Sequence, residues 1–157
     1  MQTLNVGAGR TNTEYQAAQA QHLADLRAES QEDANYFFWA AGFAATATGF
    51  LVLRLNVVVN VGVFDLLRFY GGPLGRHYAA ALYSVEALWI GILVGLGFAA
   101  RRGQRWAFLA GIGLYAADML ALIAMFSLLA FGVHAFFVYR WFRGQKSLSE
   151  MSPPSAA

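Results

Sequence analysis

Hydrophobic positions dominate the chain from residue 36 onward, in long runs separated by short polar or basic segments. Four runs, 36–53, 78–100, 106–124 and 125–142, come close to the ~20 residues that a helix needs to cross a bilayer core. The pattern predicts an all-α fold, a four-helix transmembrane bundle. The turn between the last two runs is short, so these two helices are expected to be antiparallel neighbours.

The two ends of the chain are polar and are expected to lie outside the membrane. In residues 1–35, Thr11 and Glu14 have the spacing of a capping box, and good helix formers follow. The apolar stripe of this segment is thin, with Leu23 and Leu26 as its main anchors. It predicts a cytoplasmic amphipathic helix that lies on the membrane surface or against a partner. Residues 144–157 are expected to be a disordered tail.

Residues 55–70 form an ambiguous segment between the first two runs. Polar residues interrupt its apolar stretch at four positions: Asn56, Asn60, Asp65 and Arg68. The remaining apolar length is too short for a full span, which favours an interfacial or shallow re-entrant helix. Asn56, Asn60 and Asp65 would line the mouth of a cavity or form the polar face of this helix. A five-span protein with this segment inserted stays an alternative.

Composition supports the membrane class and excludes several functions. The chain is 58% hydrophobic and 13% charged, whereas a soluble domain carries about 25% charged residues. The absence of cysteine excludes disulfides, thiolate nucleophiles and Cys-ligated clusters. Basic residues cluster beside the hydrophobic runs, so they indicate membrane topology rather than a nucleic-acid surface.

The distribution of arginine and lysine predicts the orientation of the bundle. The loop 101–105 and the end of the last run at 140–146 are both basic and are separated by two spans, so they share the cytoplasmic side. Both termini are then cytoplasmic. Three tryptophans are expected at the cytoplasmic interface: Trp39, Trp106 and Trp141. The acidic flank of the first run opposes this orientation, with Glu29, Glu32 and Asp33.

Three ionisable residues lie inside the hydrophobic runs and are the main functional clue. A rise of ~1.5 Å per residue places Glu86 ~12 Å, Asp118 ~9 Å and His134 ~12 Å from the outer edge of the membrane. Charged groups are costly in hydrocarbon, so these three side chains are expected to face one another, a cavity or a partner. One turn from the two acids lie Tyr83 and Tyr115, and Ser127 faces the same way as His134.

Two interpretations of this cluster remain open. In the functional one, an acid–imidazole group relays protons, binds a cation or holds a polar headgroup. In the structural one, His134 exchanges a hydrogen bond with Asp118, Glu86 is protonated, and the contacts fix helix register. Zinc sites need three or four ligands at defined spacing, and a haem held by two histidines lacks its second ligand, so no metal or cofactor is assigned. No catalytic motif is present, because neither H-E-x-x-H nor a nucleophile elbow occurs.

Small residues predict faces for close helix contact. Gly42 and Gly49 lie on one side of the first span, and Gly91 and Gly95 form a G-x-x-x-G motif. These faces favour a homo-oligomer or docking on a larger membrane protein. The expected function is therefore an oligomerising scaffold or accessory subunit. The alternative is a small transporter or channel for protons, cations or a lipid-like solute, acting through Glu86, Asp118 and His134.

The second half of the chain resembles a group of small uncharacterised bacterial four-span membrane proteins. An Arg-rich turn, a Trp-Ala-Phe start, a Tyr-Ala-x-Asp centre and a final His-x-Phe helix carry the resemblance. The matching residues here are Arg105, Trp106, Ala107, Phe108, Tyr115, Asp118, His134 and Phe136. The resemblance implies a four-span topology in a bacterial inner membrane, and it implies no activity.

Overall fold

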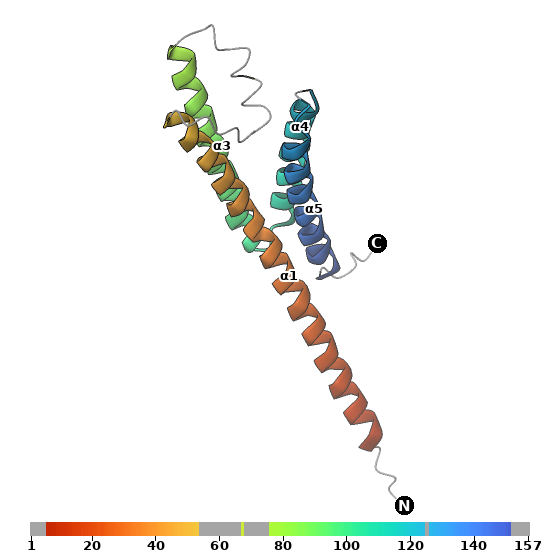
Figure 1. Ribbon diagram of the computed structural model, residues 1–157. Helices are drawn as coiled ribbons and strands as arrows, with labels where there is room; N and C mark the ends of the chain where they lie inside the picture. The colour runs from red at the N-terminus through yellow and green to blue at the C-terminus, as the bar shows by residue number, and fades with distance from the viewer. Residues whose placement is uncertain (1–5, 54–66, 68–75, 125, 152–157) are drawn as a thin grey trace, which may run out of the picture.

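The structure is a computed structural model that describes residues 6–53, 67, 76–124 and 126–151 (Figure 1). This part of the chain is all-α, with four long helices: α1 (Val6–Val52), α3 (Arg76–Arg101), α4 (Arg105–Ala124) and α5 (Leu128–Met151). Apart from Leu67, the interfacial helix expected at 55–70 lies outside the described residues, together with Asn56, Asn60 and Asp65.

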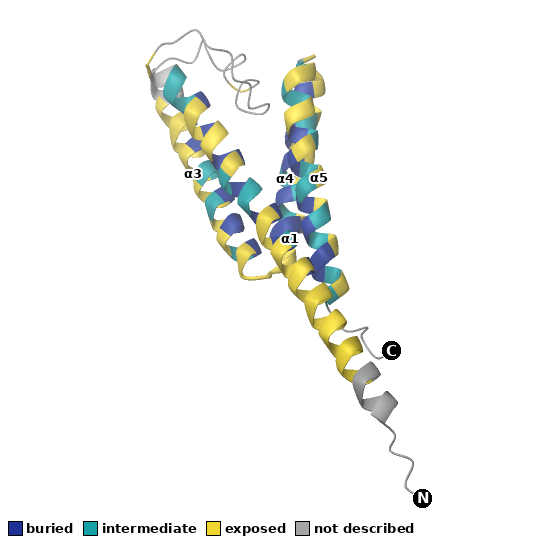
Figure 2. Cartoon of the chain, turned by 60° about the horizontal axis from the view of Figure 1, so that its bottom comes forward, coloured by how far each residue is buried: buried dark blue, intermediate teal, exposed yellow. Residues whose placement is uncertain are grey.

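The helices alternate in direction and form two pairs. α1 packs against α3 and α5, α4 packs against α5, and α3 meets α4 less extensively. The pairs α1/α3 and α4/α5 lie close together toward the base of the molecule and diverge toward its upper end in Figures 1 and 2. The antiparallel arrangement expected for the last two hydrophobic runs is confirmed.

Two helices of the described part are long and apolar enough to cross a membrane, at Ala80–Arg101 and Arg105–Ala124. The other two helices mix apolar and charged segments. The uncharged part of α1 follows a polar half, and α5 acquires arginines and a lysine after residue 139. Apolar composition, and not length, therefore distinguishes α3 and α4 from α1 and α5.

α1 joins the polar N-terminal segment and the first hydrophobic run in one uninterrupted helix of 47 residues, a length of ~70 Å. No glycine or proline occurs between residues 10 and 41 to break it. Every residue from 12 to 25 is exposed, and this half of α1 projects beyond the other helices (Figure 2). The segment expected on the membrane surface thus continues the axis of the first hydrophobic run.

α5 extends further than the hydrophobic pattern predicts. The expected tail begins at residue 144, but the helix continues to Met151. Tertiary contacts explain the difference, since Leu148 is buried in the core and the Ser147 hydroxyl donates a hydrogen bond to Glu29 Oε2 at 3.0 Å. Packing against α1 and the rest of the core stabilises residues 144–151 as the last part of the helix.

The core is aromatic and lies near the base, where the two helix pairs meet. Phe37 of α1 stacks on Trp141 of α5 with ring centroids 4.1 Å apart, and Phe108 of α4 lies 5.8 Å from Phe37. Trp141 is fully buried among the helices, and its position at the level of the membrane interface stays a prediction. Trp39 and Trp106, the other two expected interface residues, are exposed.

Two glycines allow the helices to approach closely around this core. A Cβ at Gly111 would overlap the Phe37 ring, and a Cβ at Gly144 would lie 2.7 Å from the ring of Phe108 and 2.9 Å from Asp33 Cβ. The glycines highlighted by the sequence pattern have open space instead, with nothing within 4 Å: Gly42, Gly49, Gly91 and Gly95. Their role in contacts between chains stays a prediction.

Candidate functional site

Asp118 and His134 form a buried pair between α4 and α5. The antiparallel turn places Asp118, six residues before the end of α4, opposite His134, six residues after the start of α5. His134 Nε2 lies 2.7 Å from Asp118 Oδ2, and the two residues are 6% and 2% exposed. The contact that the structural interpretation expects between these two side chains is present.

The backbone fixes the tautomer of His134. Its Nδ1 lies 2.9 Å from the carbonyl oxygen of Ala130, one turn earlier. A carbonyl oxygen can only accept a hydrogen bond, so Nδ1 must carry the proton. A single further proton between Nε2 and Asp118 then satisfies both groups, whether it resides on the imidazole or on the carboxyl. Both arrangements make the pair neutral overall, which lowers the cost of burying it.

Aromatic packing encloses this pair on one side. The Tyr115 ring stacks on His134 with centroids 4.7 Å apart and meets Trp141 edge-on at 4.8 Å. Tyr115 therefore connects the polar pair to the aromatic core.

The backbone carbonyl of Ser127 accepts the first hydrogen bond of α5, from the N–H of Phe131, so Ser127 occupies the N-cap position. Tyr83 lies partly exposed on α3.

Glu86 contacts a different helix pair. It is buried on α3, and the Thr48 hydroxyl of α1 donates a hydrogen bond to its Oε2 at 3.1 Å. The same hydroxyl lies 3.0 Å from the carbonyl oxygen of Ala44. Within the residues that the structure describes, no three histidine or acidic side chains gather closely enough to hold a metal ion. The structure thus pairs Asp118 with His134, and Glu86 with Thr48. The hydrophobic pattern did not indicate Thr48 as a partner of Glu86.

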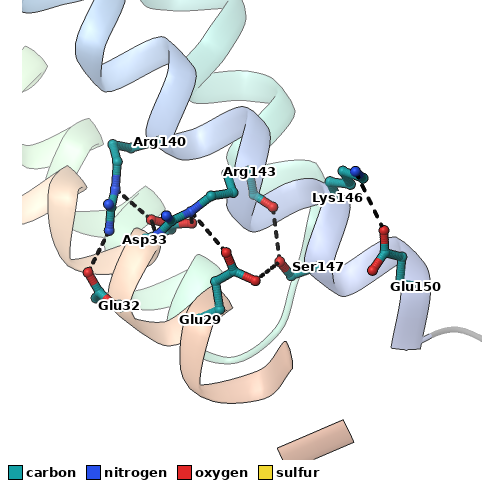
Figure 3. Close-up of polar contacts among 8 residues, drawn as sticks. All are labelled: Glu29, Glu32, Asp33, Arg140, Arg143, Lys146, Ser147 and Glu150. Atoms are coloured by element: carbon teal, nitrogen blue, oxygen red, sulfur yellow. Dashed lines mark hydrogen bonds and ion pairs between the residues drawn. The ribbon is translucent and has the colours of Figure 1, made fainter. Parts of the chain in front are cut away.

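An ion-pair cluster joins α1 to the end of α5 (Figure 3). Arg140 Nε lies 2.7 Å from Asp33 Oδ1, and Arg143 donates to both oxygens of Asp33 at 2.9 and 3.0 Å. Arg140 also pairs with Glu32 at 2.6 Å, and Arg143 with Glu29 at 3.1 Å. The cluster contains five charged residues: Glu29, Glu32, Asp33, Arg140 and Arg143.

The electrostatics of Asp33 indicate a positioning role for this cluster. Burial raises the pKa of Asp33 above its ordinary value, although the hydrogen bond from Arg143 and the charges of both arginines act to lower it. The hydrogen bond to Asp33 raises the pKa of Arg143. Because burying charges offsets much of their attraction, such a cluster contributes more to the alignment of α1 and α5 than to net stability. Helical spacing places Glu29 and Asp33 on one face, and likewise Arg140 and Arg143, but it does not show that the two pairs meet.

An apolar groove of about 620 Å³ lies between α1 and the first half of α5. Tyr36, Trp39 and Phe43 line one wall, and residues between 128 and 137 line the other. None of the three predicted ionisable residues lines it. The groove therefore provides an apolar contact surface and gives no polar route to the Asp118–His134 pair.

Comparison with protein-family models, curated proteins and solved structures finds no match for this chain. Any proposal about function therefore rests on the geometry of this chain alone. That geometry comprises a neutral buried pair, a Glu–Thr contact, an ion-pair cluster and a long projecting helix. Each of the first three connects two helices of the bundle.

Proposed function

We propose that this chain is a small membrane protein with four spanning segments that acts as a scaffold or accessory subunit. In this proposal it lies in a bacterial inner membrane with both termini in the cytoplasm. It assembles with further copies of itself or with a larger membrane protein through the projecting half of α1. The buried polar contacts serve to hold the helices in register.

Exposed apolar side chains support the membrane setting. Large hydrophobic residues cover the outer faces of α3, α4 and α5, among them Leu88, Leu109, Leu120, Leu129 and Phe142. An aqueous environment penalises continuous apolar surfaces of this kind, whereas lipid does not. α3 and α4 also have the length and apolar composition of spanning helices. The apolar parts of α1 and α5 pack beside them and would share the same layer.

The projecting half of α1 is the single observation that carries the assembly function. Residues 12–25 are exposed on all sides and make no packing contact with the bundle that would bury them. A polar helix of this kind gains little stability by itself, and a binding partner would supply the contacts that the bundle does not make with it. Tyr15 and Leu23 lie on the same broad side of the helix as Leu26, which is buried. The partner would therefore extend the packed face of the bundle along α1.

The transport alternative rests on the Asp118–His134 pair, since a buried acid–imidazole pair can pass a proton. It also needs a polar route that reaches the pair. Neither the apolar groove nor the basic pocket between α1 and the 101–105 loop is lined by Glu86, Asp118 or His134. Flux of protons or cations into liposomes that Asp118→Asn abolishes would favour transport over the scaffold function.

Cross-linking through introduced cysteines tests the assembly function, because the chain has no thiol of its own. Two separate variants, Gln19→Cys and Leu23→Cys, each carry a single thiol on the projecting helix. Glu150→Cys is the matched control, with its single thiol at the exposed end of α5. We expect oxidation in native membranes to link the first two variants to a second copy through the two introduced thiols, or a maleimide–benzophenone reagent on the same thiol to link them to a larger protein. The control is expected to remain unlinked.

Native mass spectrometry of nanodisc-extracted protein supplies the second measurement. A discrete homo-oligomer supports the scaffold, and a complex of fixed stoichiometry with a larger protein supports the accessory subunit. Leu23→Glu should dissociate either complex while the helix content of the bundle is retained. A monomer without a partner, together with unlinked cysteines at positions 19 and 23, contradicts the proposal.

A further inference from the structure

A second pocket lies at the base of the molecule, where α1, the α3–α4 turn and the end of α5 meet. Its volume is about 450 Å³, and its lining includes four arginines: Arg27, Arg101, Arg102 and Arg105. Gln31 and the 2%-exposed Ser30 add polar groups from α1. Among the residues that the structure describes, no acidic one lines this pocket. It therefore concentrates positive charge in a concave, partly polar site.

The charges of these arginines are uncompensated within the described part of the chain. Arg140 and Arg143 pair with three acidic residues of α1, but no ion pair involves Arg27, Arg101, Arg102 or Arg105. The Arg101 guanidinium is held by the neutral amide oxygen of Asn35 and lies 4.6 Å from the centroid of the Phe38 ring. These contacts orient Arg101 without neutralising it. An anion bound here would meet charges that no carboxylate already satisfies.

The backbone of the turn fixes where these arginines lie. Gly103 adopts φ +78°, its N–H donates to the Ala100 carbonyl at 2.9 Å, and Gln104 N–H donates to the Ala99 carbonyl at 3.1 Å. This is the Schellman arrangement that ends a helix, with glycine in its left-handed position. The following helix α4 begins at Arg105, so its positive N-terminal end adds to the same electrostatic field.

The pocket also lies at a defined height relative to the apolar helices. The apolar stretch of α3 ends at Arg101, and that of α4 begins at Arg105. Trp106, next to the pocket, is exposed, as is typical of tryptophan at a membrane–water interface. A site at this level is accessible both to lipid headgroups and to anions in solution.

We propose that this arginine pocket binds a phosphate group, carried either by an anionic lipid headgroup or by a soluble phosphate compound. Guanidinium groups bind phosphate oxygens through two parallel hydrogen bonds, and several of them around one concave site favour a phosphate over a neutral headgroup. The ion-pair cluster nearby does not compete for it, because its arginines already pair with Glu29, Glu32 and Asp33. The lipid form of this proposal rests on the membrane setting proposed above, and neither form depends on the scaffold function.

Arg102→Gln and Arg105→Gln test the proposal, since both residues are exposed and glutamine retains polarity without charge. Lys146→Gln is the matched control: it removes one positive charge from α5 at the same end of the molecule, outside the pocket. Binding of two probes is measured. Native mass spectrometry measures retained lipid in phosphatidylcholine nanodiscs with and without phosphatidylglycerol. Thermal shift measures the binding of inorganic phosphate to the protein in a neutral detergent. Circular dichroism verifies that each variant retains its helices.

We expect the wild-type protein to retain one phosphatidylglycerol per chain and each pocket variant to bind it at least about tenfold more weakly, the effect of one lost charge-assisted hydrogen bond. The control is expected to bind as the wild type does. A second result would also support the site: the wild type binds inorganic phosphate but shows no preference for phosphatidylglycerol, and the two pocket variants lose the phosphate binding. That result would identify a soluble phosphate compound as the ligand. Equal weakening in all three variants, or no binding of either probe by the wild type, overturns the proposal.

Discussion

At the scale of single residues, the Asp118–His134 pair shows how ionisable groups can be accommodated inside an apolar bundle. The Ala130 carbonyl fixes a proton on His134 Nδ1, so Nε2 and Asp118 need only one proton between them. The pair is then neutral in either arrangement. Hydrogen-bond donors and acceptors match in both arrangements, which accounts for the burial of the two groups.

This account makes a prediction about two substitutions at the same position. Asp118→Leu leaves Nε2 of His134 buried without a partner and should lower the free energy of unfolding by about 1–3 kcal/mol. Asp118→Asn can donate an amide N–H to Nε2 and should cost clearly less. Unfolding in mixed detergent micelles measures both variants. Equal losses in the two variants would mean that an amide cannot replace the carboxyl group in this contact, which would contradict this account.

At the scale of helices, close packing depends on glycines at positions that the sequence pattern does not highlight. Gly144 of α5 leaves room for the Phe108 ring and for the Cβ atom of Asp33. Asp33 Cβ belongs to a rigid part of α1 and cannot rotate away. Gly132 lies on the same helix with nothing within 4 Å of a built Cβ. These two glycines provide a comparison within one helix.

Gly144→Ala should lower the free energy of unfolding by about 1–3 kcal/mol, the usual cost of overpacking a core. Gly132→Ala should be neutral or slightly stabilising, because alanine is the better helix former. Denaturant unfolding in micelles, monitored by tryptophan fluorescence, measures both, since Trp141 lies in the affected core. A destabilised Gly132→Ala together with an unaffected Gly144→Ala would contradict this packing.

At the scale of the whole molecule, the ion-pair cluster bears on topology. It joins α1 just before its apolar half to α5 just after its apolar half, so these two points lie at the same end of the bundle. An even number of spans satisfies this contact, whereas a fifth span would separate the two points. The cluster also explains the acidic flank of α1, because Glu29, Glu32 and Asp33 have arginine partners.

Labelling of introduced cysteines in intact and permeabilised cells tests this topology. A membrane-impermeant maleimide should reach Phe126→Cys, in the turn between α4 and α5, from outside the cell. Gln19→Cys, Gln104→Cys and Glu150→Cys should react only after permeabilisation. Labelling of Gln19→Cys and Glu150→Cys from opposite sides would establish an odd number of spans and would be incompatible with the ion-pair cluster in one chain.

Hydrophobic periodicity by itself determined the helical class, the approximate limits of α3 and α4, and the antiparallel turn that brings Asp118 to His134. It can do so because run length and residue spacing are local properties of the chain. Only the tertiary structure decided that Trp141 is buried and that Gly111 and Gly144, rather than Gly42 or Gly91, face neighbouring helices within the chain. Which side of a nearly uniform apolar helix faces its neighbours depends on how the helices rotate against one another. Likewise, the pairing of Asp33 with two arginines and of Glu86 with Thr48 joins residues far apart in sequence, which local spacing does not specify.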